Sequence, residues 1–114
     1  MTPLAVERLS PDLCVSPQLG PESMALAAKQ GFRSIVNNRP DFEAGPEQPT
    51  SAVIEDAAIA AGLAYAHLPV APAFQSAEEI AQFAALLATM PKPILAFCRS
   101  GTRSGKLFLA ATRA

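Results

Sequence analysis

Short apolar segments alternate along this chain with segments whose apolar residues recur at helical spacing, and this alternation limits the folds available to it. Strands are expected at residues 6–9, 13–15, 32–36, 63–70 and 94–97, and helices at 21–30, 50–61, 76–90 and 102–109. Helical segments that separate buried strands are typical of a parallel sheet covered on both faces. The sequence therefore predicts an α/β fold with a parallel-rich central sheet and helices on both faces.

Turn and cap signals indicate where these segments begin and end. Ser10-Pro11-Asp12 separates the first two strands so closely that an N-terminal edge hairpin is expected. Thr50-Ser51 can cap the second helix. Ser76 and Glu79 have the spacing of a capping box, which marks the start of the third helix. Residues 37–49 are rich in Pro, Gly and Asn, so a loop is expected there.

Length and composition exclude several classes of protein. The 114 residues fit a single domain spanning 1–114, and half of them are apolar. A net charge of −1 and only 6% aromatic residues argue against a nucleic-acid partner. No apolar run reaches the ~18 residues of a membrane span and no signal peptide opens the sequence, so we expect a cytoplasmic protein without a membrane partner. Two cysteines and one histidine at scattered positions predict neither a metal site nor a bound cofactor.

The stretch from Phe97 to Lys106 carries the chemistry that the sequence indicates. It reads Phe-Cys-Arg-Ser-Gly-Thr-Arg-Ser-Gly-Lys and places Cys98 between a buried strand and a helix. Backbone N–H groups in such a loop can converge on an anion, and the helix start adds its dipole. The same surroundings lower the pKa of a cysteine. We therefore expect Cys98 to be a nucleophile, with Arg103 clamping the anionic substrate and Ser104 offering its hydroxyl to the thiolate.

The residues between Cys98 and Arg103 are candidates for binding the anion. They are Arg99, Ser100, Gly101 and Thr102. Gly101 permits a backbone conformation that other residues resist, whereas Arg99 is explained equally well as an exposed loop charge. The alternative is that Cys98 is a buried thiol at a strand end and Arg103 a surface cation. The combination of these residues at this spacing favours the functional interpretation.

Two parts of the sequence resemble known families. The loop Cys-Arg-Ser-Gly-Thr-Arg-Ser resembles the active-site loop of rhodanese-type sulfurtransferases, in which a Cys opens a six-residue loop that often ends in Arg. The segments 16–19, 37–43, 62–65 and 67–70 are similar to the phosphatase-like domain of beta-lactamase-hydrolase-like proteins. This second resemblance covers nearly the whole chain. It implies a cysteine-phosphatase-like fold, sulfur transfer or phosphatase chemistry, and a metallo-beta-lactamase-like persulfide-oxidising partner, because relatives of this domain occur joined to such domains.

Departures from the phosphatase pattern favour sulfur transfer. A cysteine phosphatase has five residues between Cys and Arg, but here Ser104 occupies the position of that arginine, and Phe97 replaces the usual histidine before the cysteine. Residues 71–75, where a phosphatase of this fold often carries its general acid, contain no Asp or Glu. We therefore expect a sulfurtransferase that forms a persulfide on Cys98 with a small anionic sulfur donor and a thiol acceptor. The alternatives are a phosphatase acting on a phosphoester and a non-catalytic module that binds anions or persulfides.

Weaker claims to a role belong to four residues outside the loop, which are Arg39, Asp41, His67 and Cys14. Arg39 and Asp41 match the family's Asn-x-Arg-Pro-Asp-x-Glu pattern and can recruit an anion or supply an acid, but a loop held by its own salt bridge is preferred. Asn38 is polar where an apolar residue is expected. His67 is interpreted as a hydrogen-bonded structural residue and Cys14 as a buried strand thiol.

Overall fold

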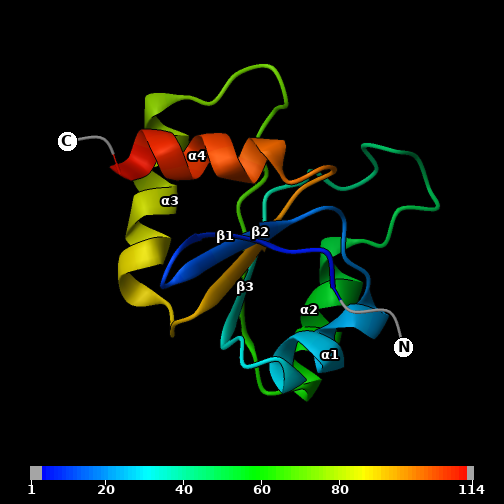
Figure 1. Cartoon of the computed structure of the whole chain (residues 1–114). Helices are drawn as coiled ribbons and strands as arrows, with labels where there is room; N and C mark the ends of the chain where they lie inside the picture. Colours follow the sequence, from blue (N-terminus) through cyan, green and yellow to red (C-terminus); the bar gives the residue numbers. More distant parts are fainter. Residues whose placement is uncertain (1–3, 113–114) are drawn as a thin grey trace.

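The computed structural model describes residues 4–112, which form one five-stranded sheet with helices on both of its faces (Figure 1). The strands are β1 (Glu7–Ser10), β2 (Leu13–Ser16), β3 (Ser34–Asn37), β4 (Ala64–His67) and β5 (Ile94–Phe97). The helices are a 3-10 turn η1 (Pro21–Ser23), α1 (Met24–Lys29), α2 (Ser51–Ala60), α3 (Ala77–Thr89) and α4 (Thr102–Thr112). The α/β architecture expected from the sequence is confirmed.

The strand order in the sheet is β1-β2-β5-β3-β4, which places β5 in the middle. β1 and β2 pair antiparallel as the expected edge hairpin, whereas β2–β5, β5–β3 and β3–β4 are parallel. Ala96 of β5 stands opposite Val15 on one side and Val36 on the other. Because the parallel strands share a direction, the segments that follow β2, β3, β4 and β5 meet at one edge of the sheet.

Side chains that alternate along the strands build one core on each face of the sheet. On one face, Ile35 and Leu95 belong to a buried cluster with residues of α1 and α2. On the other, Val36 and Ala96 belong to a cluster with Phe83 of α3 and Leu107 of α4, and α3 and α4 contact each other. Successive side chains of a pleated strand point to opposite faces of the sheet, so β3 and β5 contribute to both cores. The sheet therefore holds β5, and the loop after it, rigidly.

Helix caps form where the sequence predicts them. The Thr50 hydroxyl accepts a hydrogen bond from the Val53 N–H at 3.4 Å and so caps α2. Ser76 and Glu79 form both bonds of the capping box, at 3.1 and 2.8 Å, and so fix the start of α3. None of the helices described between residues 4 and 112 has the length and apolar character needed to cross a membrane.

Several expected elements differ from the structure at their ends, and two differ most. The helix expected from residue 21 begins as the 3-10 turn η1, because Gly20 has no side chain to cap the first turn, and only residues 24–29 are α-helical. The strand expected over 63–70 is limited to β4, since Pro69 has no N–H to donate. Even so, Leu68 and Val70 donate to the carbonyls of Asn37 and Asn38, so this segment runs beside the end of β3.

Candidate active site

Cys98 lies directly after the central strand, at the edge of the sheet where the parallel strands end. Its side chain belongs to the lining of a hollow of about 250 Å³, although only 1% of the residue is exposed. The residues that line this hollow are Pro72, Cys98, Arg99, Ser100, Thr102, Arg103 and Lys106. We call it the reactive hollow. Four of the seven are basic or hydroxyl-bearing residues of the predicted loop, namely Arg99, Ser100, Thr102 and Arg103. The fold brings them together around the sulfur of Cys98.

The sulfur of Cys98 lies among backbone N–H groups. The Gly101 N–H donates to Cys98 Sγ at 3.1 Å. Burial raises the pKa of the Cys98 thiol, but hydrogen bonds from the backbone N–H groups of Ser104, Ser100 and Gly101 outweigh burial and hold the pKa below its ordinary value. Because the ionised form is the nucleophile, this arrangement suits Cys98 to attack a substrate.

Gly101 is required by the shape of this loop. Its φ is +92°, a region that residues with a Cβ rarely adopt, and an added Cβ would lie 3.4 Å from the backbone of Ser16. The turn at Gly101 directs its own N–H to the sulfur, and the Gly101 carbonyl accepts the first bond of α4 from Gly105 at 3.0 Å. The loop and the helix start are therefore one unit.

The hydroxyl of Ser104 has a different main partner from the one expected. It donates to Asn38 Oδ1 at 2.8 Å, and a hydroxyl has only one proton to give. Ser104 lowers the pKa of Cys98 mainly through its backbone N–H, and its hydroxyl makes the smallest contribution. Asn38 was not a candidate in the sequence, yet it is fully buried and its side-chain N–H donates to the Leu68 carbonyl at 3.1 Å. Its buried amide explains why this position is not apolar.

Replacing Asn38 with alanine is expected to destabilise the fold by about 2–4 kcal/mol. The substitution leaves two buried groups without partners, the Ser104 hydroxyl and the Leu68 carbonyl. Urea denaturation measures the change, with Gln82→Ala on the exposed side of α3 as the control. A loss below about 1 kcal/mol would show that Asn38 does not hold the loop.

Arg103 is buried in the reactive hollow, but its guanidinium is already engaged. Nη1 and Nη2 donate to the two carboxylate oxygens of Glu43, both at 3.1 Å, and Nη1 also donates to the Val70 carbonyl at 3.0 Å. The expected two-pronged clamp on a substrate is therefore filled by Glu43 in this structure. Among residues 4–112, Arg103 Nε is the only buried side-chain nitrogen or oxygen without a hydrogen-bond partner. That N–H therefore has no acceptor among the described residues.

Glu43 joins Arg103 to Arg39. Arg39 Nε donates to Glu43 Oε1 at 2.7 Å, and its Nη1 donates to Gln18 Oε1 at 3.0 Å. Burial raises the pKa of Glu43, but the hydrogen bonds from Arg103 and Arg39 outweigh burial and lower it below its usual value. Sequence reasoning did not single out Glu43, because its partner Arg103 lies 60 residues away.

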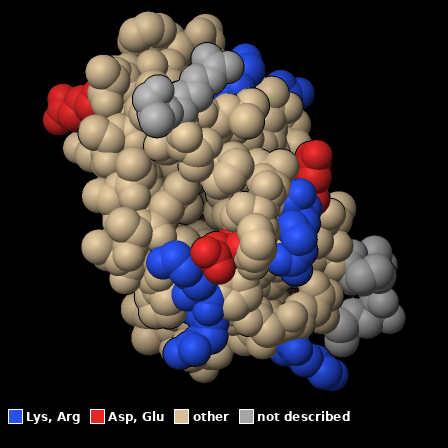
Figure 2. All heavy atoms as spheres, turned by 60° about the vertical axis from the view of Figure 1, so that its left-hand side comes forward, with Lys and Arg blue, Asp and Glu red and all other residues tan. Residues whose placement is uncertain are grey.

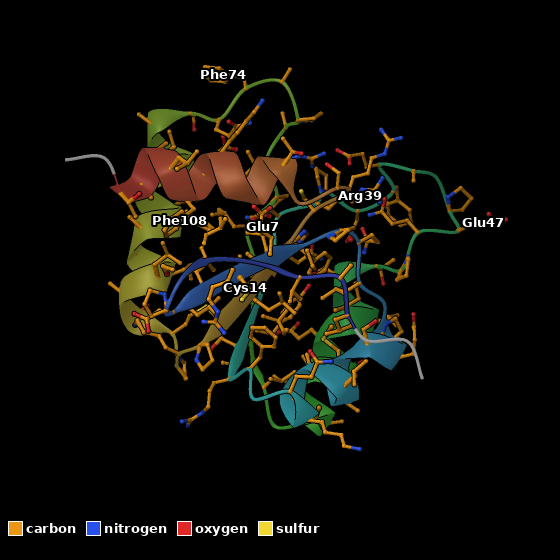
Figure 3. The ribbon with its side chains drawn as sticks, in the orientation of Figure 1. Glu7, Cys14, Arg39, Glu47, Phe74 and Phe108 are labelled. Atoms are coloured by element: carbon orange, nitrogen blue, oxygen red, sulfur yellow. The ribbon has the colours of Figure 1, made fainter. Side chains whose placement is uncertain are left out.

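Arg39 and Asp41 hold their loop in place and do not line the reactive hollow. The internal salt bridge of this loop is Arg39–Glu43, whereas Asp41 accepts a hydrogen bond from the Ser51 N–H at 2.7 Å and so fixes the start of α2. The His67 ring hydrogen-bonds the Arg39 carbonyl at 2.8 Å, which agrees with a structural role. Figure 3 shows Arg39 on this loop and Cys14 within the sheet. Cys14 is 2% exposed.

The remaining loop candidates lie at the rim of the reactive hollow. Arg99, Ser100 and Thr102 are exposed, and Lys106, which the sequence analysis did not select, adds a second cation from the next turn of α4. The Ser100 hydroxyl donates to Thr102 Oγ1 at 3.1 Å. On the face that Figure 2 presents, basic and acidic side chains are interspersed. Arg99 and Lys106 place two positive charges at the rim of the reactive hollow.

Comparison with known proteins matches nearly the whole chain to one family. The model of the phosphatase-like domain of beta-lactamase hydrolase-like proteins matches residues 5–113. The beta-lactamase hydrolase-like protein of Xylella fastidiosa is 38% identical over 96 residues, which are 84% of this chain and 22% of that protein. Its counterpart in Agrobacterium fabrum is 39% identical over 80 residues, 70% of this chain and 18% of that protein. The chain thus spans about a fifth of the length of these curated relatives.

Solved structures share the fold. A Neisseria meningitidis protein, crystallised as a candidate phosphatase, superposes with a TM-score of 0.82 at 33% identity, over 95% of this chain and 74% of that one. The P. aeruginosa protein TpbA in complex with pTyr superposes with a TM-score of 0.67 at 19% identity, over 94% of this chain and 62% of that one. The second likeness shows the fold alone. The expected cysteine-phosphatase-like fold is confirmed.

Proposed function

This chain belongs to the family of phosphatase-like domains of beta-lactamase hydrolase-like proteins, and we propose that within this fold Cys98 serves as the nucleophile of a sulfurtransferase. The observation that carries the proposal is the cluster of backbone N–H groups around Cys98 Sγ, which lowers the pKa of the thiol and so favours the nucleophilic thiolate. The names of the structural relatives point to phosphatases instead. The sulfurtransferase proposal therefore rests on the chemistry of the reactive hollow.

The reaction proceeds in two steps and needs only the sulfur donor and the acceptor. The Cys98 thiolate attacks the outer sulfur of thiosulfate, the S–S bond of the donor breaks, and sulfite leaves with the bonding electrons. Cys98 then carries a persulfide anion, whose terminal sulfur passes to a thiol or another nucleophile and restores the thiolate. Arg103 Nε and the cations of the rim hold the oxygens of the donor.

The absence of an acid in the hollow supports sulfur transfer over phosphoester cleavage. Of the described residues, the seven that line the reactive hollow include no Asp or Glu. Glu43 lies beside Arg103, but its lowered pKa leaves it without a proton to donate at neutral pH. An alkoxide leaving group without a general acid loses about 10²–10⁴ in rate. Sulfite is a stable anion and needs no proton.

Phosphoester hydrolysis is the second candidate, and the comparisons favour it. A relative at 33% identity that covers 95% of this chain was crystallised as a candidate phosphatase. In this alternative Cys98 attacks phosphorus and forms a phosphoenzyme, which water hydrolyses. Substrates with good leaving groups, such as aryl phosphates, suit a site without an acid.

One assay series separates the two candidates. We expect thiosulfate-to-cyanide sulfur transfer that disappears in Cys98→Ser, and aryl phosphate hydrolysis at most a minor activity. Phosphate turnover that depends on Cys98, without sulfur transfer, would replace the first candidate by the second. Tight thiosulfate binding with no turnover of either kind would leave only a binding module.

The acceptor and the cellular setting of the reaction are part of the proposal. We propose that the persulfide passes to a thiol acceptor in the cytoplasm and that a metallo-beta-lactamase-like persulfide-oxidising partner consumes the product. The matched region is 22% and 18% of the length of the two curated relatives, which leaves room for such a partner in the same chain. Oxygen uptake by such an enzyme, mixed with this protein, thiosulfate and a thiol acceptor, tests the link. We expect uptake above that of the same mixture made with Cys98→Ser, and equal uptake in the two mixtures would contradict the link.

A further inference from the structure

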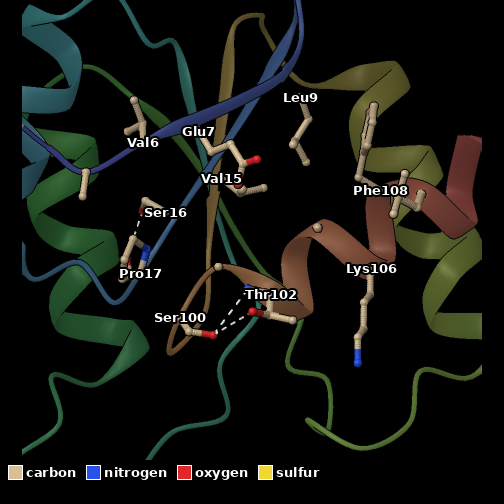
Figure 4. Close-up of a pocket in the computed structure, with 14 residues that line it drawn as sticks. Val6, Glu7, Leu9, Val15, Ser16, Pro17, Ser100, Thr102, Lys106 and Phe108 are labelled. Carbon is tan, nitrogen blue, oxygen red and sulfur yellow. Dashed lines mark hydrogen bonds between the residues drawn. The ribbon is translucent and has the colours of Figure 1, made fainter.

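A second and larger hollow borders the reactive hollow. It has a volume of about 620 Å³ and lies between the β1–β2 hairpin and α4 (Figure 4). Its lining residues are Ala5, Val6, Glu7, Leu9, Val15, Ser16, Pro17, Ser100, Gly101, Thr102, Gly105, Lys106, Phe108 and Leu109. We call it the apolar groove, because most of these side chains are hydrocarbon. Its volume is typical of a site for a small organic molecule.

The apolar groove lies next to the reactive hollow and shares part of its lining. Ser100, Thr102 and Lys106 line both. Figure 4 shows these three residues on one side of the groove, across from Val6 and Leu9. A molecule bound with its reactive end at Cys98 can therefore extend over the loop and place its remaining part between the hairpin and α4.

Two charged side chains line the groove, and together they favour one orientation of such a molecule. Lys106 stands at the junction with the reactive hollow, whereas Glu7 lines the hairpin side. An anionic group is attracted to Lys106 and repelled by Glu7. Val6 and Leu109 remain 40% and 58% exposed, so they have apolar surface left to cover. The matching ligand has one anionic end and an apolar body.

We propose that the apolar groove binds the hydrocarbon part of an organic sulfur donor, a thiosulfonate with an apolar substituent, whose anionic end reacts at Cys98. This inference rests on the proposed function and names its substrate class. Cys98 thiolate attacks the terminal sulfur of the donor, the bond between that sulfur and the sulfonyl sulfur breaks, and the sulfinate leaves with the electron pair. The products are the Cys98 persulfide anion and an organic sulfinate, so charge and atoms balance.

The test compares an organic with an inorganic donor in one groove variant. Leu109→Gln removes apolar surface from the groove but keeps a good helix former. We expect kcat/KM for benzenethiosulfonate to fall about fivefold, mainly through KM, because roughly one partly buried leucine contact is lost. Turnover of thiosulfate, which has no apolar part, is expected to stay unchanged. The matched control is Ile59→Gln on α2, which is 62% exposed outside the groove and should alter neither donor.

Two results would overturn the groove proposal. One is an equal fall for both donors in Leu109→Gln, which would indicate a general effect on the loop. The other is no fall for either donor. A binding measurement keeps the test independent of turnover: calorimetry should show benzenesulfinate binding more tightly than methanesulfinate, with the difference lost in Leu109→Gln. If both sulfinates bind alike, the groove proposal fails. If the difference appears but no donor is turned over, the sulfurtransferase proposal fails and the groove remains.

Discussion

Sulfur transfer is expected to fall by at least about 10³-fold when Cys98 is replaced by serine, because a hydroxyl at this position cannot form a persulfide. The fold should survive, since the two side chains differ by one atom and the Gly101 N–H can donate to either. The measurement is the initial rate of thiocyanate formation from thiosulfate and cyanide, together with the circular dichroism spectrum of the variant.

Cys14→Ala is the matched control for this result. Cys14 is buried in β2 and does not line the reactive hollow, so its loss should leave the rate unchanged within about threefold. Undiminished transfer by Cys98→Ser would remove Cys98 from the mechanism. A large loss in Cys14→Ala with the fold intact would show that the persulfide is resolved by the second thiol.

Replacing Arg103 with lysine is expected to lower kcat/KM by about 10²–10³-fold. A lysine keeps the charge, but it cannot hold Glu43 with two nitrogens, donate to Val70 and present a free Nε–H at once. The rate constants for thiosulfate and a urea denaturation curve should be measured on the same protein. This pair of measurements separates lost substrate binding from lost stability.

Arg33→Lys is the control for Arg103→Lys, because Arg33 is exposed ahead of β3 and outside the hollow. It should change neither rate nor stability. If Arg103→Lys retains kcat/KM within about threefold, positive charge alone is sufficient and the geometry of the guanidinium has no role.

The fold could be predicted from the sequence where local signals are strong. The bounds of β5, Ile94–Phe97, are those that the apolar run indicates, and the caps at Thr50 and Ser76 form as expected. The Cys98 loop could also be placed, because a thiol between a buried strand and a helix is a local pattern. The strand order could not be predicted, since it depends on pairings between segments far apart in the chain.

The missed parts of the site depend on such distant contacts. Arg103 is expected from the sequence to bind a substrate, but its guanidinium holds Glu43 from a loop 60 residues earlier. Ser104 is expected from the sequence to offer its hydroxyl to the Cys98 thiolate, but that hydroxyl donates to Asn38, which is 66 residues earlier. Glu43 ends the family's Asn-x-Arg-Pro-Asp-x-Glu pattern and Asn38 is unexpectedly polar, but neither signal identifies the distant partner. Residues 37–49 come close to the Cys98 loop only when β3 pairs with β5.

The acidity of the Cys98 thiol is the direct test of the claim that its surroundings lower its pKa and favour the thiolate. The measurement is the rate of iodoacetamide alkylation as a function of pH, in Cys14→Ala so that one thiol reacts. Only the thiolate is alkylated, so the rate rises as pH passes through the pKa and then levels off. The hydrogen bonds to Sγ predict a midpoint below the ordinary thiol value of about 8.5. A midpoint at or above that value would contradict the account.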